Sequence, residues 1–179
     1  NCKISLPGHY VDELSSEGMK KCPSGSFNEN YGGSSIHDCT LSRPGHYSDL
    51  EGISEIPCPT GYYQPERGTT SCLKTSPGFY SSEIASISQK PCLPGTFQPL
   101  ENSSYCITTD PGNFTDSASS VEQFECLRGT YQPSRGAFQC ISSDPGYFVP
   151  KNGSTSQIRC PAGSYQKDPT SWQCLSVSD

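Results

Sequence analysis

The sequence contains few of the residues that form a large hydrophobic core. Leu, Ile, Val and Phe together make up 29 of the 179 residues, and there is only one Trp and one Met. This share lies below the roughly 20% that marks the edge of intrinsic disorder. A chain of this composition either remains disordered or is held together by covalent links. The sequence therefore excludes a single globule built around one large apolar core.

Clustered positive charge and long apolar runs are also missing. Lys and Arg number 12 against 18 Asp and Glu, which gives a net charge of −6 with both signs scattered. Nucleic acids and anionic membranes are bound by clustered positive charge, so neither is an expected partner. No apolar run approaches the roughly 20 residues of a membrane-spanning helix, so direct membrane insertion is not expected either.

Motifs for catalysis and for metal binding are absent. There is no Gly-x-Ser-x-Gly nucleophile motif, no phosphate-binding glycine loop, no EF-hand spacing and no Cys-x-x-Cys pair. His9, His37 and His46 form no metal-ligand pattern, and Asp110 and Asp144 precede Pro-Gly, where Asp usually forms a turn. We therefore expect no enzyme, no cofactor and no metal centre.

Cysteine is abundant and regularly spaced. The chain has 11 cysteines, and from Cys58 onward a short gap, as from Cys58 to Cys72, alternates strictly with a longer one, as from Cys72 to Cys92. Many spaced cysteines without close pairs indicate disulfides and an oxidising compartment, so a secreted or cell-surface location is expected. The positions are Cys2, Cys22, Cys39, Cys58, Cys72, Cys92, Cys106, Cys126, Cys140, Cys160 and Cys174.

The resulting period of about 34 residues predicts a tandem array of repeats. The expected fold is small, disulfide-rich and mostly β or irregular, as an elongated array of such units with short hairpins and little helix. Repeats are expected at residues 1–38, 39–71, 72–105, 106–139 and 140–173, with the start of a further repeat or a linker at 174–179.

Each repeat divides into two halves that share a Gly-x-aromatic motif. The glycine is the second residue of a turn signal such as Pro-Gly, and we expect it to adopt positive φ. The aromatic is then expected to begin a short strand. Tyr63, Phe97, Tyr131 and Tyr165 are expected to lie largely buried against the nearby cysteines. The motif aromatics are Tyr10, Phe27, Tyr47, Tyr63, Tyr80, Phe97, Phe114, Tyr131, Phe148 and Tyr165.

The short half-repeat resembles two known extracellular modules. Its four copies are CPTGYYQPERGTTSC (58–72), CLPGTFQPLENSSYC (92–106), CLRGTYQPSRGAFQC (126–140) and CPAGSYQKDPTSWQC (160–174). Cys-x-x-Gly-x-Tyr/Phe closed by a cysteine is similar to the first disulfide loop of tumour-necrosis-factor-receptor cysteine-rich domains. It also resembles the ephrin-receptor-like cysteine-rich repeats of many extracellular proteins. The chain differs from the former in having two cysteines per repeat.

Two nearest-neighbour disulfide registers fit the spacing, and crossed pairings are also open. One closes the short loops as 22–39, 58–72, 92–106, 126–140 and 160–174 and leaves Cys2 without a partner in the segment. The other closes the long loops and leaves Cys174. The resemblance implies the short-loop register, in which four of the five loops have the same length. Cys2 would then meet another segment.

Three Asn-x-Ser/Thr sequons, at Asn102, Asn113 and Asn152, predict N-glycosylation of a secreted protein. We expect a non-enzymatic structural glycoprotein whose array continues past both ends and forms a stalk, coat or filament by end-to-end assembly. Its partners would be copies of itself or adjoining repeats of a longer chain. The alternative is a receptor or adhesin ectodomain for an extracellular protein or glycan ligand, with Tyr31 and His37 of the expanded first repeat as its candidate site.

Overall fold

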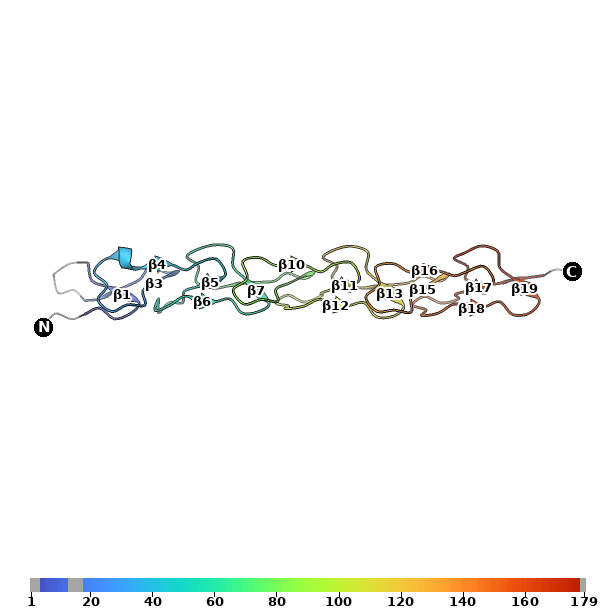
Figure 1. Cartoon of the computed structure of the whole chain (residues 1–179), viewed down its shortest axis with the longest axis horizontal. Coiled ribbons are helices and arrows are strands. Elements are labelled where there is room, and N and C mark those ends of the chain that lie inside the picture. The colour runs from blue at the N-terminus through green and yellow to red at the C-terminus, as the bar shows by residue number, and fades with distance from the viewer. Residues whose placement is uncertain (1–3, 13–17, 178–179) are drawn as a thin grey trace. The chain divides into compact units, whose positions relative to one another are not determined.

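The chain folds into a succession of very short hairpins. A computed structural model describes residues 4–12 and 18–177. These residues form two-residue strands and one 3₁₀ helix, η1 (Ile36–Asp38), which is the coiled ribbon in Figure 1. No helix within the described ranges is long and apolar enough to cross a membrane.

The strands pair as antiparallel neighbours along the chain. They are β1 (His9–Tyr10) with β2 (Lys20–Lys21), β3 (Ser26–Phe27) with β4 (Thr40–Leu41), β5 (His46–Tyr47) with β6 (Ile56–Pro57), β7 (Tyr62–Tyr63) with β8 (Leu73–Lys74), β9 (Phe79–Tyr80) with β10 (Lys90–Pro91), β11 (Thr96–Phe97) with β12 (Ile107–Thr108), β13 (Asn113–Phe114) with β14 (Phe124–Glu125), β15 (Thr130–Tyr131) with β16 (Ile141–Ser142), β17 (Tyr147–Phe148) with β18 (Ile158–Arg159), and β19 (Ser164–Tyr165) with β20 (Leu175–Ser176). This confirms the expected array of short hairpins.

From β7 onward, two hairpins fall within each cysteine period. In the β7–β8 hairpin Tyr63 faces Leu73, and in the β11–β12 hairpin of the next repeat Phe97 faces Ile107 in the same register. Hairpins that carry cysteines alternate with hairpins that carry none. In the hairpin after β8, Thr75 and Gln89 occupy the positions of Cys58 and Cys72.

The chain consists of two compact units. The first holds the described residues up to Ser76 together with Ser81–Lys90 and Asn102–Ser104. The second holds Pro77–Tyr80, Pro91–Glu101 and the described residues from Tyr105 onward. The same hydrogen-bond pattern recurs inside each unit.

Within the first unit, backbone hydrogen bonds join each half-repeat to the next. The N–H of Gly61 donates to the carbonyl oxygen of Ser81 at 2.8 Å, and the N–H of Gln64 donates to that of Ser86 at 2.9 Å. In the opposite direction, the N–H of Ala85 donates to the carbonyl of Cys58 at 2.8 Å. Polar backbone groups that lie under neighbouring turns are thereby satisfied, as buried peptide groups require.

The second unit repeats these bonds with other residues. Gly95 donates to the carbonyl of Thr115 at 2.8 Å, Gln98 to that of Ser120 at 3.0 Å, and Gly112 to that of Gln132 at 2.7 Å. The stacking of half-repeats therefore rests on backbone groups, which every sequence supplies, and depends little on apolar side chains.

Two structural constraints favour glycine at the turn positions of the motif. The φ angles of these glycines lie between +78° and +89°, a region that L-residues with a Cβ rarely adopt. In addition, a Cβ on Gly112 would overlap with the carbonyl oxygen of Gly153, which belongs to the second half-repeat further along. The close approach of these chain segments thus depends on the absence of a side chain.

The buried positions are filled by disulfides and small polar side chains. Cys58, Cys92 and Cys126 have no exposed surface, and neither do Thr75 and Thr109. The interior of each unit is therefore a row of bridges and hydroxyl groups rather than an apolar core.

The expectation that the four short-loop aromatics are largely buried holds only in part. Tyr63, Phe97 and Tyr131 are only half-buried, and Tyr165 is 39% exposed. Tyr10 in the two-residue strand β1 is buried, so short strands do not by themselves prevent burial of a motif ring.

Candidate functional site

The ten described cysteines form five disulfides in the short-loop register. Each bridge spans a Cα–Cα distance of 5.7 or 5.8 Å, within the usual range for disulfides. Cys2 lies outside the described residues. The pairs are Cys22–Cys39, Cys58–Cys72, Cys92–Cys106, Cys126–Cys140 and Cys160–Cys174.

A glutamine holds each regular short loop in addition to its disulfide. The side chain of Gln98 is buried; its Nε2 donates to the carbonyl of Tyr105 at 2.8 Å, and its Oε1 accepts from the N–H of Leu100 at 3.1 Å. Gln64, Gln132 and Gln166 make the same pair of bonds in their loops. This role was not predicted from the sequence, although a Gln follows every short-loop motif aromatic from Tyr63 onward.

In the half-repeats without cysteine, a hydrogen bond stands where the disulfide would be. The Oε1 of Gln89 accepts from the N–H of Ser76 at 2.7 Å, and Gln123 and Gln157 accept from Asp110 and Asp144 at 2.8 and 2.7 Å. The Nε2 of Gln157 also donates to the Asp144 carboxylate at 2.6 Å. This places both aspartates in turns tied to glutamine, as the sequence predicted for a turn former.

In the second repeat a glutamate takes this tethering position. Oε2 of Glu55 accepts from the N–H of Arg43 at 3.1 Å, while the Arg43 guanidinium pairs with Oε1. Burial opposes ionisation of this side chain, which is 13% exposed, but the hydrogen bonds and the charge of Arg43 outweigh it and lower the pKa of Glu55. The carboxylate is therefore the stable form of this tether.

The expanded first repeat offers no convergent cluster of polar groups around its candidate residues. His37 lies exposed in η1, and Tyr31 is 69% exposed in the preceding loop. The Asp38 carboxylate instead folds back onto the loop: the N–H groups of Ser34 and Ser35 donate to it, and these bonds lower the pKa of Asp38. Across residues 4–12 and 18–177, no group of three His, Cys, Asp or Glu side chains could hold a metal ion.

The three sequons differ in their surroundings. Asn102 and Asn152 are exposed, and Oδ1 of Asn152 accepts from the N–H of Arg128 at 2.9 Å. Asn113 is half-buried in β13, where its Nδ2 donates to the carbonyl of Pro111 at 3.3 Å. The hydroxyl of its sequon partner Thr115 is fully buried. Two of the three acceptor sites are thus open on the folded chain.

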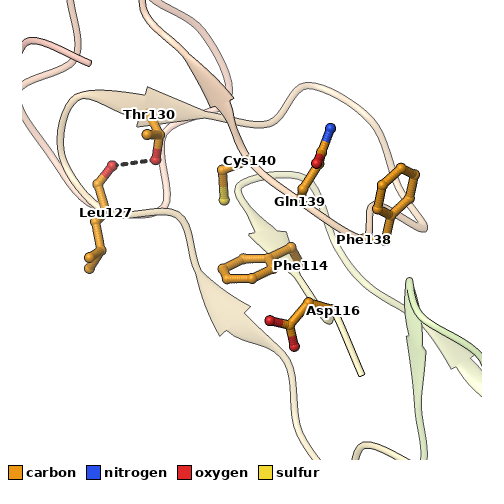
Figure 2. A pocket seen from close by; sticks show the side chains of 7 residues that line it. All are labelled: Phe114, Asp116, Leu127, Thr130, Phe138, Gln139 and Cys140. Carbon is orange, nitrogen blue, oxygen red and sulfur yellow. Dashed lines mark hydrogen bonds between the residues drawn. The ribbon is translucent and has the colours of Figure 1, made fainter. Parts of the chain in front are cut away.

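A hollow of about 480 Å³ lies in the second unit, beside the Cys126–Cys140 bridge (Figure 2). Leu127 and Phe138 are 67% and 58% exposed, so the hollow is open to solvent. The ring of Phe114 lies between Cys140 and Asp116 in Figure 2, and the Phe114 ring also packs at 6.2 Å against that of Phe124. The lining residues are Phe114, Asp116, Leu127, Thr130, Phe138, Gln139 and Cys140.

Comparison with known proteins confirms the resemblance to ephrin-receptor-like cysteine-rich repeats. Residues 45–92 match the family described as "Tyrosine-protein kinase ephrin type A/B receptor-like". A mouse protein, "Sushi, von Willebrand factor type A, EGF and pentraxin domain-containing protein 1", is 36% identical over 73 residues. That match covers 40% of this chain and 2% of the mouse protein.

These likenesses agree with the disulfide-rich fold. Both point to a protein with cysteine-rich domains of the extracellular type, as the spacing of its cysteines indicates. Because the chain spans about 2% of the length of the curated relative that it matches, that relative's own domain composition says nothing about further domains here.

Proposed function

We propose that the chain is a non-enzymatic structural glycoprotein of the extracellular space, a disulfide-laddered repeat rod that forms a stalk, coat or fibre. The observation that carries this proposal is the uniform link between half-repeats. In each unit, the same backbone hydrogen bonds join successive half-repeats, as between Gly61 and Ser81 and between Gly95 and Thr115. An array linked in this way can grow to any length without a larger core.

The buried side chains support the same function. Most of them are cystine, Ser, Thr and Gln that bind neighbouring backbone groups, for example Thr75, whose hydroxyl accepts from the N–H of Ser103 at 2.8 Å. Such positions specify the path of the chain and supply no reactive group. Copies of the array would join end to end, because a backbone-to-backbone link is the same between chains as within one chain.

Electron microscopy of the purified secreted protein, with sedimentation velocity over a range of concentrations, tests this proposal. We expect thin, extended particles that lengthen into filaments as the concentration rises. A variant with a globular domain fused to each end should remain monomeric, because the fused domains block the end contacts. Compact particles, or association that the end fusions leave unchanged, would contradict it.

A second function, that of a receptor or adhesin ectodomain, is favoured by one observation. The hollow beside Cys126–Cys140 collects exposed apolar side chains and an exposed carboxylate at one place. A rod does not require such a place, and its chemistry carries the inference that follows.

A further inference from the structure

The hollow in the second unit departs from the repetition of the chain. Phe138 is an exposed aromatic residue of the hollow, whereas Ser104 occupies the equivalent position in the preceding repeat. The carboxylate of the hollow is Asp116, but the equivalent residue of the following repeat is Pro150. The preceding repeat thus lacks the aromatic, and the following one lacks the carboxylate. The combination of these two side chains is therefore not required by the repeat fold itself.

The carboxylate of Asp116 can accept further hydrogen bonds. One oxygen, Oδ1, accepts from the Ser117 hydroxyl at 2.8 Å, and no Lys, Arg or His in the described ranges forms an ion pair with this side chain. Figure 2 shows the carboxylate below the ring of Phe114 and close to the hollow. The neighbouring Asp110, by contrast, pairs with Arg135 at 3.1 Å. A negative charge is therefore available at the edge of an apolar depression.

Aromatic faces and a carboxylate together are complementary to a cation that carries apolar surface. The ring faces of Phe114 and Phe138 attract a cation through their quadrupole, and Asp116 attracts it directly. Among side chains, the Arg guanidinium fits best, because it is planar, weakly hydrated and able to stack on a ring while it donates two hydrogen bonds to one carboxylate. Leu127 offers apolar surface for the methylene groups of the same side chain.

We propose that this hollow is a docking site for an arginine side chain in a basic segment of an extracellular partner protein. Arg rather than a neutral group is the occupant, because both the carboxylate of Asp116 and the ring faces beside it attract positive charge. The site lies within one compact unit and on exposed side chains, so binding requires no rearrangement of the array. The proposal is independent of filament formation, and either can fail without the other.

Titration of the ¹⁵N-labelled chain with acetyl-arginine-amide, followed by NMR, tests the site. We expect saturable shifts of the backbone amides of Phe114, Asp116 and Gln139. Acetyl-citrulline-amide has the same shape without the charge and should bind at least about threefold more weakly, as the loss of a cation–π contact predicts. Asp116→Asn and Phe138→Ser should each weaken the arginine probe by about the same factor.

The control is Asp168→Asn, which neutralises an exposed carboxylate elsewhere in the second unit and should leave binding unchanged. Because Asp116 and Phe138 are exposed, their variants should keep the amide spectrum of the remaining hairpins, which verifies folding directly. The proposal is overturned if the arginine probe causes no saturable shifts, if citrulline binds equally well, or if Asp168→Asn weakens binding as much as Asp116→Asn does. Tighter binding of N-acetylglucosamine than of arginine would also overturn it and indicate a glycan site.

Discussion

At the scale of single residues, the chain replaces apolar packing with buried polar groups that have partners. Thr115 shows the arrangement: its hydroxyl accepts from the N–H of Gly95 at 2.8 Å and donates to the carbonyl of Thr96 at 3.3 Å. Ser81 occupies the equivalent place in the preceding repeat, but its buried hydroxyl has no hydrogen-bond partner among the described residues. A buried polar atom without a partner destabilises the folded state.

Removal of these two hydroxyls should therefore have opposite effects on the free energy of unfolding. Ser81→Ala should raise the free energy of unfolding by about 1 kcal/mol, because it removes an unsatisfied buried group. Thr115→Val, a change of similar shape, should lower it by about 1 kcal/mol, because the carbonyl of Thr96 loses the hydroxyl donor while the N–H of Gly95 keeps only the carbonyl of Thr115. Urea denaturation of the oxidised protein measures both. Equal signs for the two variants would refute this account of the buried positions.

Glu55 makes the second repeat sensitive to acid. Its pKa is lowered in the folded state, so the ionised carboxylate stabilises the fold at pH values above its ordinary pKa of 4.5. This stabilisation is lost as the pH falls below 4.5 and through the lowered value. The protection factor of the β5–β6 hairpin against hydrogen exchange should therefore fall on acidification, relative to that of the β9–β10 hairpin, which has Gln89 at this position.

The matched variants for this prediction are Glu55→Gln and Glu66→Gln. The former keeps a side-chain oxygen for the N–H of Arg43 and should remove the acid dependence of the protection factor in the hairpin. The latter changes an exposed carboxylate and should leave that dependence as it is. Acid dependence that survives in Glu55→Gln would assign it to another group.

At this scale the sequence predicted the conformation of the turn glycines, and the burial of the aromatics only in part. Gly-x-aromatic predicted turns with positive φ, since that conformation is a local property of the turn. Burial of Tyr165 depends instead on how much protein surrounds the ring, which the motif does not encode. The recurring Gln after each short-loop aromatic was visible, but its tethering role was not, because the partner of Gln98, Tyr105, lies at the far end of the loop.

At the scale of the hairpin, the closeness of successive turns limits which residues are tolerated. Gly112 and Gly136 both have positive φ, at +83° and +70°, but a Cβ on Gly112 would meet the carbonyl of Gly153, whereas a Cβ on Gly136 would have nothing within 4 Å. The two positions therefore separate backbone strain from steric overlap within one unit.

Alanine at these two glycines should have unequal costs. Gly136→Ala should lower the free energy of unfolding by about 1–2 kcal/mol, the cost of left-handed backbone for a residue with a Cβ. Gly112→Ala should lower it by about 1–3 kcal/mol more, because the overlapping turn must move. Thermal and urea denaturation, compared at equal disulfide content, give the difference. A loss at Gly136 as large as that at Gly112 would show that turn proximity adds nothing.

The alternation of the hairpins could have been derived further from the sequence. Aligning the chain with itself at half the cysteine period places Thr75 and Gln89 on Cys58 and Cys72, so each period contains two copies of one hairpin. The alternating short and long gaps pointed to loops of two kinds, whereas the structure has one kind with two ways of closing it. Equivalence of a disulfide and a Gln–backbone bond is a geometric fact that residue types do not reveal.

At the scale of the whole molecule, exposure should determine which sequons carry glycans. Asn102 and Asn152 are exposed, whereas Asn113 is half-buried and followed by the buried Thr115. In a eukaryotic secretory host we expect high occupancy at the first two and the lowest occupancy at Asn113, which could be modified only before its hairpin forms. Peptide mapping with and without glycosidase gives the occupancy of each site. Full occupancy of Asn113 with none at Asn152 would contradict the expected order.

The disulfide ladder also limits how far the chain can be stretched by force. Each regular bridge closes a sequence separation of 14, with Cα atoms 5.7 or 5.8 Å from each other. Under tension, only the connection between bridges, such as 72–92, can straighten, to about 70 Å at roughly 3.5 Å per residue. Without the bridge, a repeat would extend to about 120 Å. A pulled array would therefore lengthen in equal, limited steps and shorten again with its disulfide loops intact. A reducing agent would break the loops and make the array both longer and more extensible under the same force.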